Sequence, residues 1–403
     1  MCKGSVVLDA TQKSILKDKK HCCVPDFESL DIELNIIDLK QKVATDYRPI
    51  PTLFREQMAP LKSLEYADKL PTFHKVRDSL YKARQKSTHT QFDNFEDIAI
   101  PENLAKNFVC VQDTDILICV TSECKDWITG LKTYFLDGTF KSVPKPFIQL
   151  YTIHVDIGSD EEHTKVVPCV YALLPDKRQC TYERLFKAVE QNIPTFRPEF
   201  IKVDYEIGAI NALRSIFPSA AISGCYFHYS QALYKNADIF GTTSSREGAR
   251  HVAKCAALAH LPALKIHEGW MIISAASPQM SEITRFNEYM IKQWLKMDMV
   301  SIMTCYGHRH RTNNVVESWH KKMNNRIHNN ANLLYFLSEL RKEALDVNYI
   351  NLQNEIRSDI FRKRNNKYLM MDNKIQSIVN NYLQGLSSLD KCITLLSILK
   401  YKI

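Results

Sequence analysis

The feature that most constrains the fold is a change of hydrophobic period near the middle of the chain. Apolar runs predict three strands, at 134–140, 147–157 and 165–174. In the second run alternate residues from Tyr151 to Ile157 are apolar, and this period of two is typical of a β-strand. From Tyr182 to Val189 the apolar residues recur at i, i+3, i+4 and i+7, which marks one face of a helix. Strands are therefore expected first, and helices afterwards.

Strands and helices alternate beyond this change. Two further strands are expected at 200–204 and 220–227, with helices at 207–217 and 229–238. The order βββαβαβα predicts an α/β fold whose core is a mixed five-stranded sheet, which is the order of an RNase H-like core. Asp137 and Asp204 each stand at the end of a strand. Because strands one and four are parallel neighbours in that fold, we expect both carboxylates at the same edge of the sheet.

Composition excludes several classes of protein. Apolar residues make up 45% of the 403 residues, enough to build a core and to exclude wholesale disorder. No run approaches 18 apolar residues, so no membrane span is expected. The first 25 residues lack the layout of a secretory signal, so the twelve cysteines read as reduced thiols or metal ligands in the cytosol or nucleus. The net charge of +8 permits a polyanionic partner without requiring one.

Three carboxylates are candidates for chemistry: Asp137, Asp204 and Glu317. Cleavage of a phosphodiester by a two-metal site needs hard oxygen ligands around two ions about 3.5–4 Å apart. Two carboxylates at adjacent strand ends, and a third on a helix beside them, can supply such ligands.

Each of these carboxylates also has a structural interpretation. Asp137 precedes Gly138 and can belong to a turn, because Asp-Gly is a common turn pair. Asp204 can cap the following helix. Glu317 stands three residues after Asn314, which is the spacing of a capping box.

The residues divide the chain into five regions. A basic tail is followed by a mostly helical stretch, the α/β core, a helical insertion without strand signals, and a final region that opens with the helix of Glu317. Their bounds are 1–24, 25–125, 126–240, 241–305 and 306–403.

Several ordered blocks of the sequence resemble the MULE (Mutator-like element) transposase domain. They fall in order over about 112–345, and this ordered agreement is more specific than any single block. The blocks are 136–140, 149–154, 167–175, 203–213, 224–232 and 311–320.

The resemblance implies a DDE transposase on an RNase H-like fold, with Asp137, Asp204 and Glu317 as the triad. It implies two Mg²⁺ or Mn²⁺ ions on these three residues, cleavage of double-stranded DNA at transposon terminal repeats, and attack of the freed 3′-OH on target DNA. Nuclear localisation and a homo-oligomer when active follow from such a substrate. A domesticated or decayed derivative that binds DNA or protein without cleaving is the alternative, and a resolvase-type nuclease is a third interpretation.

The Cys225-x-x-His228 pair matches the CxxH block of the same superfamily, which is thought to support the active site structurally. A lone CxxH supplies only two of the four ligands that zinc usually takes. The alternatives are a buried small apolar residue for Cys225 and a satisfied histidine at a helix start for His228.

Two basic segments are candidates for DNA contacts. The first surrounds Glu317, the only acidic residue across 306–330; a solvated helix face is the alternative. Its cations are Arg309, Arg311, Lys321, Lys322 and Arg326. The second is the N-terminus, where Cys2, His21 and Cys23 resemble the end of a FLYWCH/WRKY-type zinc finger. That finger is truncated and one ligand short, and a basic tail is the alternative interpretation of this segment.

Overall fold

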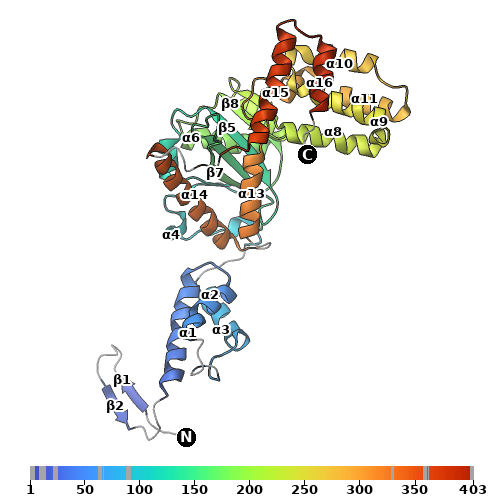
Figure 1. The fold of residues 1–403 in the computed structure, drawn as a ribbon. Helices are drawn as coiled ribbons and strands as arrows, with labels where there is room; N and C mark the ends of the chain where they lie inside the picture. The colour runs from blue at the N-terminus through green and yellow to red at the C-terminus, as the bar shows by residue number, and fades with distance from the viewer. Residues whose placement is uncertain are drawn as a thin grey trace. The chain divides into compact units, whose positions relative to one another are not determined.

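The computed structural model forms two compact units, residues 1–90 and 91–403. The residues that it describes are 5–8, 15–20, 26–61, 66, 68–87, 92–327, 331–356, 361 and 363–399 (Figure 1). The zinc candidates Cys2, His21 and Cys23 lie outside the described residues. The finer division into five regions stays a prediction.

The first unit contains a two-stranded hairpin and three helices. The hairpin pairs β1 (Ser5–Leu8) and β2 (Ile15–Lys19) in antiparallel fashion. The helices are α1 (Phe27–Thr45), α2 (Ile50–Met58) and α3 (Phe73–Ser87), with a 3₁₀ turn η1 (Ala59–Leu61) after α2. Leu39, Val43, Leu53 and Leu80 are buried together, so the three helices share a small core.

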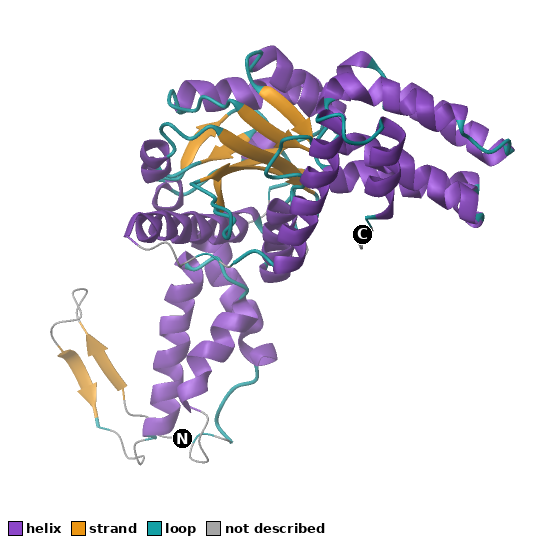
Figure 2. Ribbon diagram, turned by 45° about the horizontal axis from the view of Figure 1, so that its top comes forward, coloured by secondary structure: helices purple, strands orange, loops and turns teal. Residues whose placement is uncertain are grey.

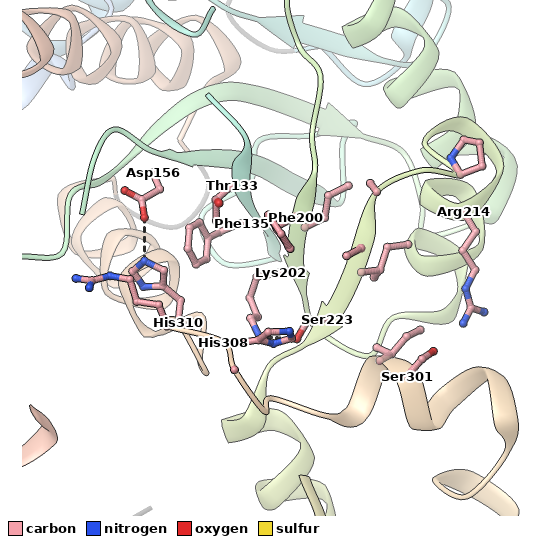
Figure 3. Close-up of a pocket in the computed structure, with 18 residues that line it drawn as sticks. Thr133, Phe135, Asp156, Phe200, Lys202, Arg214, Ser223, Ser301, His308 and His310 are labelled. Atoms are coloured by element: carbon pink, nitrogen blue, oxygen red, sulfur yellow. Dashed lines mark hydrogen bonds and ion pairs between the residues drawn. The ribbon is translucent and has the colours of Figure 1, made fainter. Parts of the chain in front are cut away.

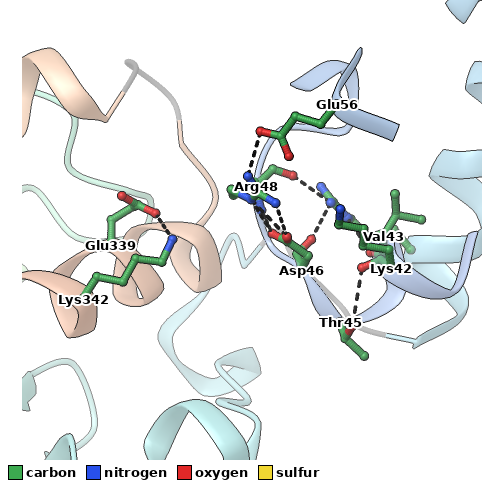
Figure 4. Close-up of polar contacts among 9 residues, drawn as sticks. Lys42, Val43, Thr45, Asp46, Arg48, Glu56, Glu339 and Lys342 are labelled. Atoms are coloured by element: carbon green, nitrogen blue, oxygen red, sulfur yellow. Dashed lines mark hydrogen bonds and ion pairs between the residues drawn. The ribbon is translucent and has the colours of Figure 1, made fainter. Parts of the chain in front are cut away.

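Buried Arg84 closes the end of α1. Its Nε donates to the carbonyl of Val43 at 3.0 Å, and its Nη2 donates to the carbonyls of Asp46 at 2.7 Å and Arg48 at 2.8 Å. The last carbonyls of a helix have no partner within the helix, so a side chain from α3 satisfies them here. Arg48 in turn binds the carboxylates of Asp46 and Glu56 (Figure 4).

The second unit is built on a mixed seven-stranded sheet. Its strand order is β3-β4-β7-β6-β5-β8-β9. The parallel pairs are β5 with β8 and β8 with β9, and the other pairs are antiparallel. The strands are β3 (Val109–Gln112), β4 (Leu117–Cys119), β5 (Thr133–Thr139), β6 (Gln149–Asp156), β7 (Val166–Leu174), β8 (Phe200–Val203) and β9 (Ala221–Gly224).

The sheet has two strands more than the five expected. β3 and β4 form a hairpin, and β4 pairs with β7. The expectation was too small because this hairpin is short and lies in a stretch whose composition is mixed. The remaining five strands lie within a few residues of their expected positions.

Helices cover both faces of the sheet (Figure 2). On one face, α6 (Gln179–Asn192) and α7 (Ile207–Ile216) pack on a core that includes Tyr134, Leu136 and Val203. On the other face, α13 (Asn314–Arg326) contacts β5 and α14 (Leu333–Ile356) contacts β7. Phe135 points to this second side and is buried with Val316 of α13. Successive residues of β5 therefore serve opposite faces, as a strand requires.

Every element between 226 and 303 is helical, and helices from the end of the chain pack with them. Figure 1 shows α15 (Asn366–Leu383) and α16 (Leu389–Ile398) beside this segment, and α16 contacts α9 and α10. The segment contains α8 (Tyr226–Phe240), α9 (Arg246–Ala257), α10 (Ala263–Ala275), α11 (Ser281–Gln293) and α12 (Met297–Met303), with η3 (Thr242–Ser244) and η4 (Leu258–His260). Short elements near the start of the unit are η2 (Phe95–Asp97), α4 (Glu102–Ala105) and α5 (Ser122–Trp127).

Among the described residues, no helix is both long and apolar enough to cross a bilayer.

Candidate active site

The register of two parallel strands brings Asp137 and Asp204 opposite each other. The last paired residues of these strands are Phe135 of β5 and Lys202 of β8, and Asp137 and Asp204 each lie two residues beyond this pair. Neighbouring strands lie about 4.8 Å apart. The two carboxyl groups are close enough that the charge of Asp204 contributes to raising the pKa of Asp137.

Asp137 lies inside β5, so it is not a turn residue. Only 6% of its surface is exposed, and its Oδ1 accepts a hydrogen bond from the backbone N–H of Gly138 at 2.8 Å. Its pKa is raised to about 7, mainly by burial and then by the charge of Asp204, while His228 acts in the opposite direction. The side chain is therefore poised between its neutral and charged forms.

Asp204 follows β8 directly and does not cap α7, whose N-cap is Glu206. Its Oδ1 accepts a hydrogen bond from the N–H of Glu206 at 3.2 Å, just before α7 begins. Burial raises its pKa, which the N–H of Glu206 and the charge of His228 partly offset. One oxygen of the carboxylate thus binds the backbone just before the helix.

Glu317 lies in the first turn of α13 without forming the expected capping box. The N-cap of this helix is Asn313, whose side chain makes no capping hydrogen bond. Asn313 instead donates from Nδ2 to the carbonyl of Leu136 at 3.3 Å, which ties the helix to β5 beside Asp137. Burial raises the pKa of Glu317, which His228 opposes.

His228 is the cation among the three carboxylates. Its Nε2 lies 3.4 Å from Oε1 of Glu317. Burial lowers the pKa of His228, but Cys225, Asp137 and Glu317 outweigh this effect and raise it to about 9. The imidazole is therefore protonated near neutral pH and offsets part of the negative charge.

Cys225 is buried at the N-cap of α8, three residues before His228. Its Sγ accepts a hydrogen bond from the N–H of Asn313 at 3.2 Å. The same asparagine therefore joins the start of α8 to the start of α13 and to β5. The CxxH pair and Glu317 are brought together although 89 positions separate His228 from Glu317.

The three carboxylates do not converge on one point. Within the described residues, the only group of three candidate ligands whose atoms all lie within 4.8 Å of one another is Cys225, His228 and Glu317. Asp137, Asp204 and Glu317 are coupled electrostatically but are spread more widely. This spread does not suit a single ion held by all three, whereas a pair of ions about 3.5–4 Å apart spans a wider cluster.

Sequence reasoning missed a second layer beneath Asp137. Nδ1 of His320 lies 3.7 Å from Oδ2 of Asp137, and its Nε2 lies 3.0 Å from Oγ1 of Thr152. Thr152 also contacts Nε2 of His154 at 3.1 Å. Burial lowers the pKa of His320 to about 4, so this ring is neutral at physiological pH. The signal available was the spacing of three between Glu317 and His320, which places them on one helix face.

The residues predicted to bind DNA largely make contacts within the chain. Lys322 and Arg326 bind the buried carboxylates of Glu343 and Glu339, with a Lys322 Nζ to Glu343 Oε1 distance of 2.7 Å. Arg311 pairs with Asp372. Arg309 donates to backbone carbonyls, that of His163 at 3.1 Å among them. Lys321 is exposed and makes no ion pair with the described residues. A DNA role for this set stays a prediction.

A cavity of about 500 Å³ opens beside Glu317. Aromatic and basic side chains line it, including Tyr226, Arg311, Arg364 and Tyr368. The carboxyl group of Glu317 therefore borders a space that polar ligands can reach, with cations along its wall.

A larger cavity of about 590 Å³ lies on the α13 side of β5, β8 and β9 and touches none of the three carboxylates (Figure 3). Phe135, Lys202 and Ser223 form one row across the strands by register. Nζ of Lys202 donates to Oγ of Ser223 at 2.6 Å, and Nδ1 of His308 lies 3.0 Å from the same hydroxyl. Burial lowers the pKa of Lys202 to about 8. This cavity is separate from the carboxylate cluster.

A comparison with known protein families gives a match that includes the two aspartates. Residues 133–232 match the MULE transposase domain. The matched region is about a quarter of the chain and includes Asp137, Asp204, Cys225 and His228; it ends before Glu317. Comparison with curated proteins finds no match. For the segment from β5 to the first turns of α8, the match supports a Mutator-like transposase family. A transposase domain implies DNA as the partner.

Proposed function

We propose that this chain is a Mutator-like DNA transposase whose catalytic carboxylates are Asp137, Asp204 and Glu317. The observation that carries the proposal is the proximity of Asp137, in β5, and Asp204, directly after the parallel strand β8: the charge of Asp204 contributes to raising the pKa of Asp137. Both lie within the residues that match the MULE transposase domain. Glu317 joins them from α13, and its charge contributes to raising the pKa of Asp137.

The sheet topology supports an RNase H-like core. Taken from β5 in chain order, five strands lie in the spatial order 3-2-1-4-5, with the second antiparallel to its neighbours. In this arrangement the first and fourth strands are adjacent and parallel. The proposed core therefore uses β5 to β9, and the β3–β4 hairpin extends it at one edge.

The donor set of the cluster fits divalent metal ions. Three carboxylates lie close enough to interact electrostatically, and burial together with the charges of Asp204 and Glu317 raises the pKa of Asp137. Oε1 of Glu317 is buried and has no hydrogen bond to the described residues. Mg²⁺ and Mn²⁺ prefer such oxygen ligands. When bound, two such ions activate the attacking oxygen and stabilise the leaving oxygen of a phosphodiester.

The chain's own residues have defined tasks in this proposal. The three carboxylates hold the ions, and protonated His228 balances their charge. Neutral His320, held by Thr152, orients Asp137. Arg311 lines the cavity beside Glu317, and Lys321 is exposed four positions after Glu317; we assign phosphate contacts to these two cations. Assembly of at least two copies belongs to the same proposal, because joining two transposon ends needs two active sites. Nuclear localisation belongs to it as well, because the substrate is DNA.

The test uses labelled duplexes taken from the DNA that flanks the coding sequence, incubated with the full chain and Mn²⁺. Nicking that is lost in Asp137→Asn, Asp204→Asn and Glu317→Gln is the expected result. Asp113→Asn is the control, because this carboxylate lies in the loop between β3 and β4 and pairs with Arg184 on the surface.

Two outcomes would contradict the proposal. Nicking that survives in all three variants would assign the activity to other residues. Binding of the duplex without nicking, in Mn²⁺ and also in Mg²⁺, would favour the alternative, a decayed derivative that binds DNA without cleaving it.

A further inference from the structure

We propose that Cys225, His228 and Glu317 form a binding site for one thiophilic divalent ion of the Zn²⁺ type, distinct from the proposed Mg²⁺ pair. The three residues come from two helix starts: Cys225 and His228 open α8, and Glu317 lies in the first turn of α13. One ligand atom from each lies within 4.8 Å of the other two.

The spacing of the ligand atoms suits a small tetrahedral ion. Two atoms held about 2.0–2.1 Å from Zn²⁺ at the tetrahedral angle are roughly 3.3 Å apart. Nε2 of His228 and Oε1 of Glu317 are 3.4 Å apart, so an ion between them requires almost no movement of either side chain. The thiol of Cys225 completes three ligands and leaves the fourth position for water.

One carboxylate oxygen of this cluster accepts no hydrogen bond from the described residues. This atom, Oε1 of Glu317, is buried, although Nε2 of His228 forms an ion pair with it at 3.4 Å. Sγ of Cys225 accepts a hydrogen bond from the N–H of Asn313 at 3.2 Å, which holds the sulfur in place at the start of α8. An ion would bind the carboxylate oxygen, the sulfur and Nε2 of His228 together, and the protons of the thiol and the imidazole would be released to solvent.

The chemistry of the donors selects the ion. A thiolate and an imidazole with one carboxylate favour Zn²⁺ over Mg²⁺, because soft and borderline ligands suit the softer ion. All-oxygen ligation by Asp137 and Asp204 has the opposite preference. The site therefore discriminates between two kinds of metal that share one ligand, Glu317.

A regulatory consequence follows, and it rests on the proposed function. An ion bound by Cys225 and His228 holds Glu317 on the α8 side and removes it from the Mg²⁺ pair. Zn²⁺ is therefore expected to inhibit Mn²⁺-dependent nicking, and Cys225→Ser is expected to relieve that inhibition.

The direct test measures metal binding without any activity. Co²⁺ is added to the full chain after metals have been stripped under reducing conditions, and absorbance is followed in the near ultraviolet. We expect one equivalent to produce a thiolate-to-cobalt charge-transfer band that Zn²⁺ abolishes. Cys225→Ser is expected to remove the band, and His228→Asn to weaken Co²⁺ binding at least about tenfold. Melting curves confirm that each variant is folded.

The control variant is Cys305→Ser. Sγ of Cys305 lies 3.2 Å from Nδ1 of His260, so it is another buried Cys–His pair. Within the described residues this pair belongs to no group of three candidate ligands. We therefore expect this variant to keep the band unchanged.

The outcomes separate this proposal from the proposed function. Absence of the band in the wild type, its persistence in Cys225→Ser, or its loss in Cys305→Ser would overturn the metal site. Asp137→Asn keeps all three ligands and is expected to keep the band. If the band appears but the wild type does not nick DNA, the metal site stands and the transposase proposal is wrong. If nicking occurs without a band, the reverse holds.

Discussion

Replacing Asp137 by Asn is expected to stabilise the metal-free protein, and by more at higher pH. The folded chain holds this carboxyl group with 6% of its surface exposed, beside Asp204 and Glu317. Asn has nearly the same shape and carries no charge. The substitution therefore removes the unfavourable charge and keeps the packing of β5.

The magnitude follows from the shift of the pKa from 3.8 to about 7. A shift of one unit corresponds to about 1.36 kcal/mol. The folded pKa lies above the unfolded one, so the folded state binds more protons and wild-type stability falls as the pH rises between the two values. The penalty is about 2 kcal/mol at pH 5 and about 4 kcal/mol at pH 8. The variant is expected to be more stable than the wild type by about these amounts.

The assay is urea unfolding with a chelator present, measured from pH 5 to pH 8 for the wild type, Asp137→Asn and the surface control Asp113→Asn. Addition of Mg²⁺ in place of the chelator should stabilise the wild type, because an ion that binds only the folded state shifts the equilibrium. The variant should respond much less. The prediction therefore couples a gain in stability to a loss of metal response.

One result would refute this reasoning. If Asp137→Asn were as stable as the wild type at pH 8, or less stable, the charged carboxyl group would not destabilise the folded state. The inference that it is buried among like charges would then be wrong. A stability difference that does not change between pH 5 and pH 8 would refute the pKa assignment in the same way.

Three further predictions concern other buried charges. Lys202→Met should raise the free energy of unfolding by about 3 kcal/mol at pH 7, because burial lowers the pKa of Lys202 to about 8. In calorimetry, the wild type should gain stability between pH 8 and 10.5, and the variant should not share that gain. Arg84→Met leaves three carbonyls, at the end of α1 and in the loop after it, without this donor and should cost the first unit about 3 kcal/mol. Faster hydrogen exchange in α1 and α3, with the second unit unchanged, is the expected readout. Glu343→Gln weakens the bonds from Trp319 and Lys322 and should lower stability in chemical unfolding by about 1–3 kcal/mol, whereas Glu355→Gln on the exposed end of α14 should have no effect.

The sequence predicted the part of the fold that depends on local period. β5, β6 and β7 are apolar over most of their length, and α6 repeats at the helical spacing, so their positions follow from the residues themselves. The neighbouring positions of Asp137 and Asp204 followed from the order of these elements. β3 escaped notice because its four residues are only partly buried and show no period.

The contacts that depend on tertiary packing were beyond the reach of sequence reasoning. Lys322 and Arg326 appeared to be free cations, and the sequence does not tell that α14 lies against α13 and offers Glu343. His320 is oriented by Thr152, a residue of β6 that has no chemical signal of its own. Glu317 could be nominated from its block, but its proximity to His228 rather than to the aspartates depends on how two helix starts meet.

One consequence of the course of α8 concerns the transmission of movement. This helix begins with the residues of the cluster and runs 15 residues, about 22 Å, into the helical segment. Tyr229, next to His228, packs edge-on against Trp294 with ring centroids 4.7 Å apart. His228 and Tyr229 belong to the same helical turn, so their positions are linked through the backbone of α8. A substitution at Trp294 that shifts Tyr229 is therefore expected to displace the neighbouring His228 as well, and with it the positive charge beside the carboxylates.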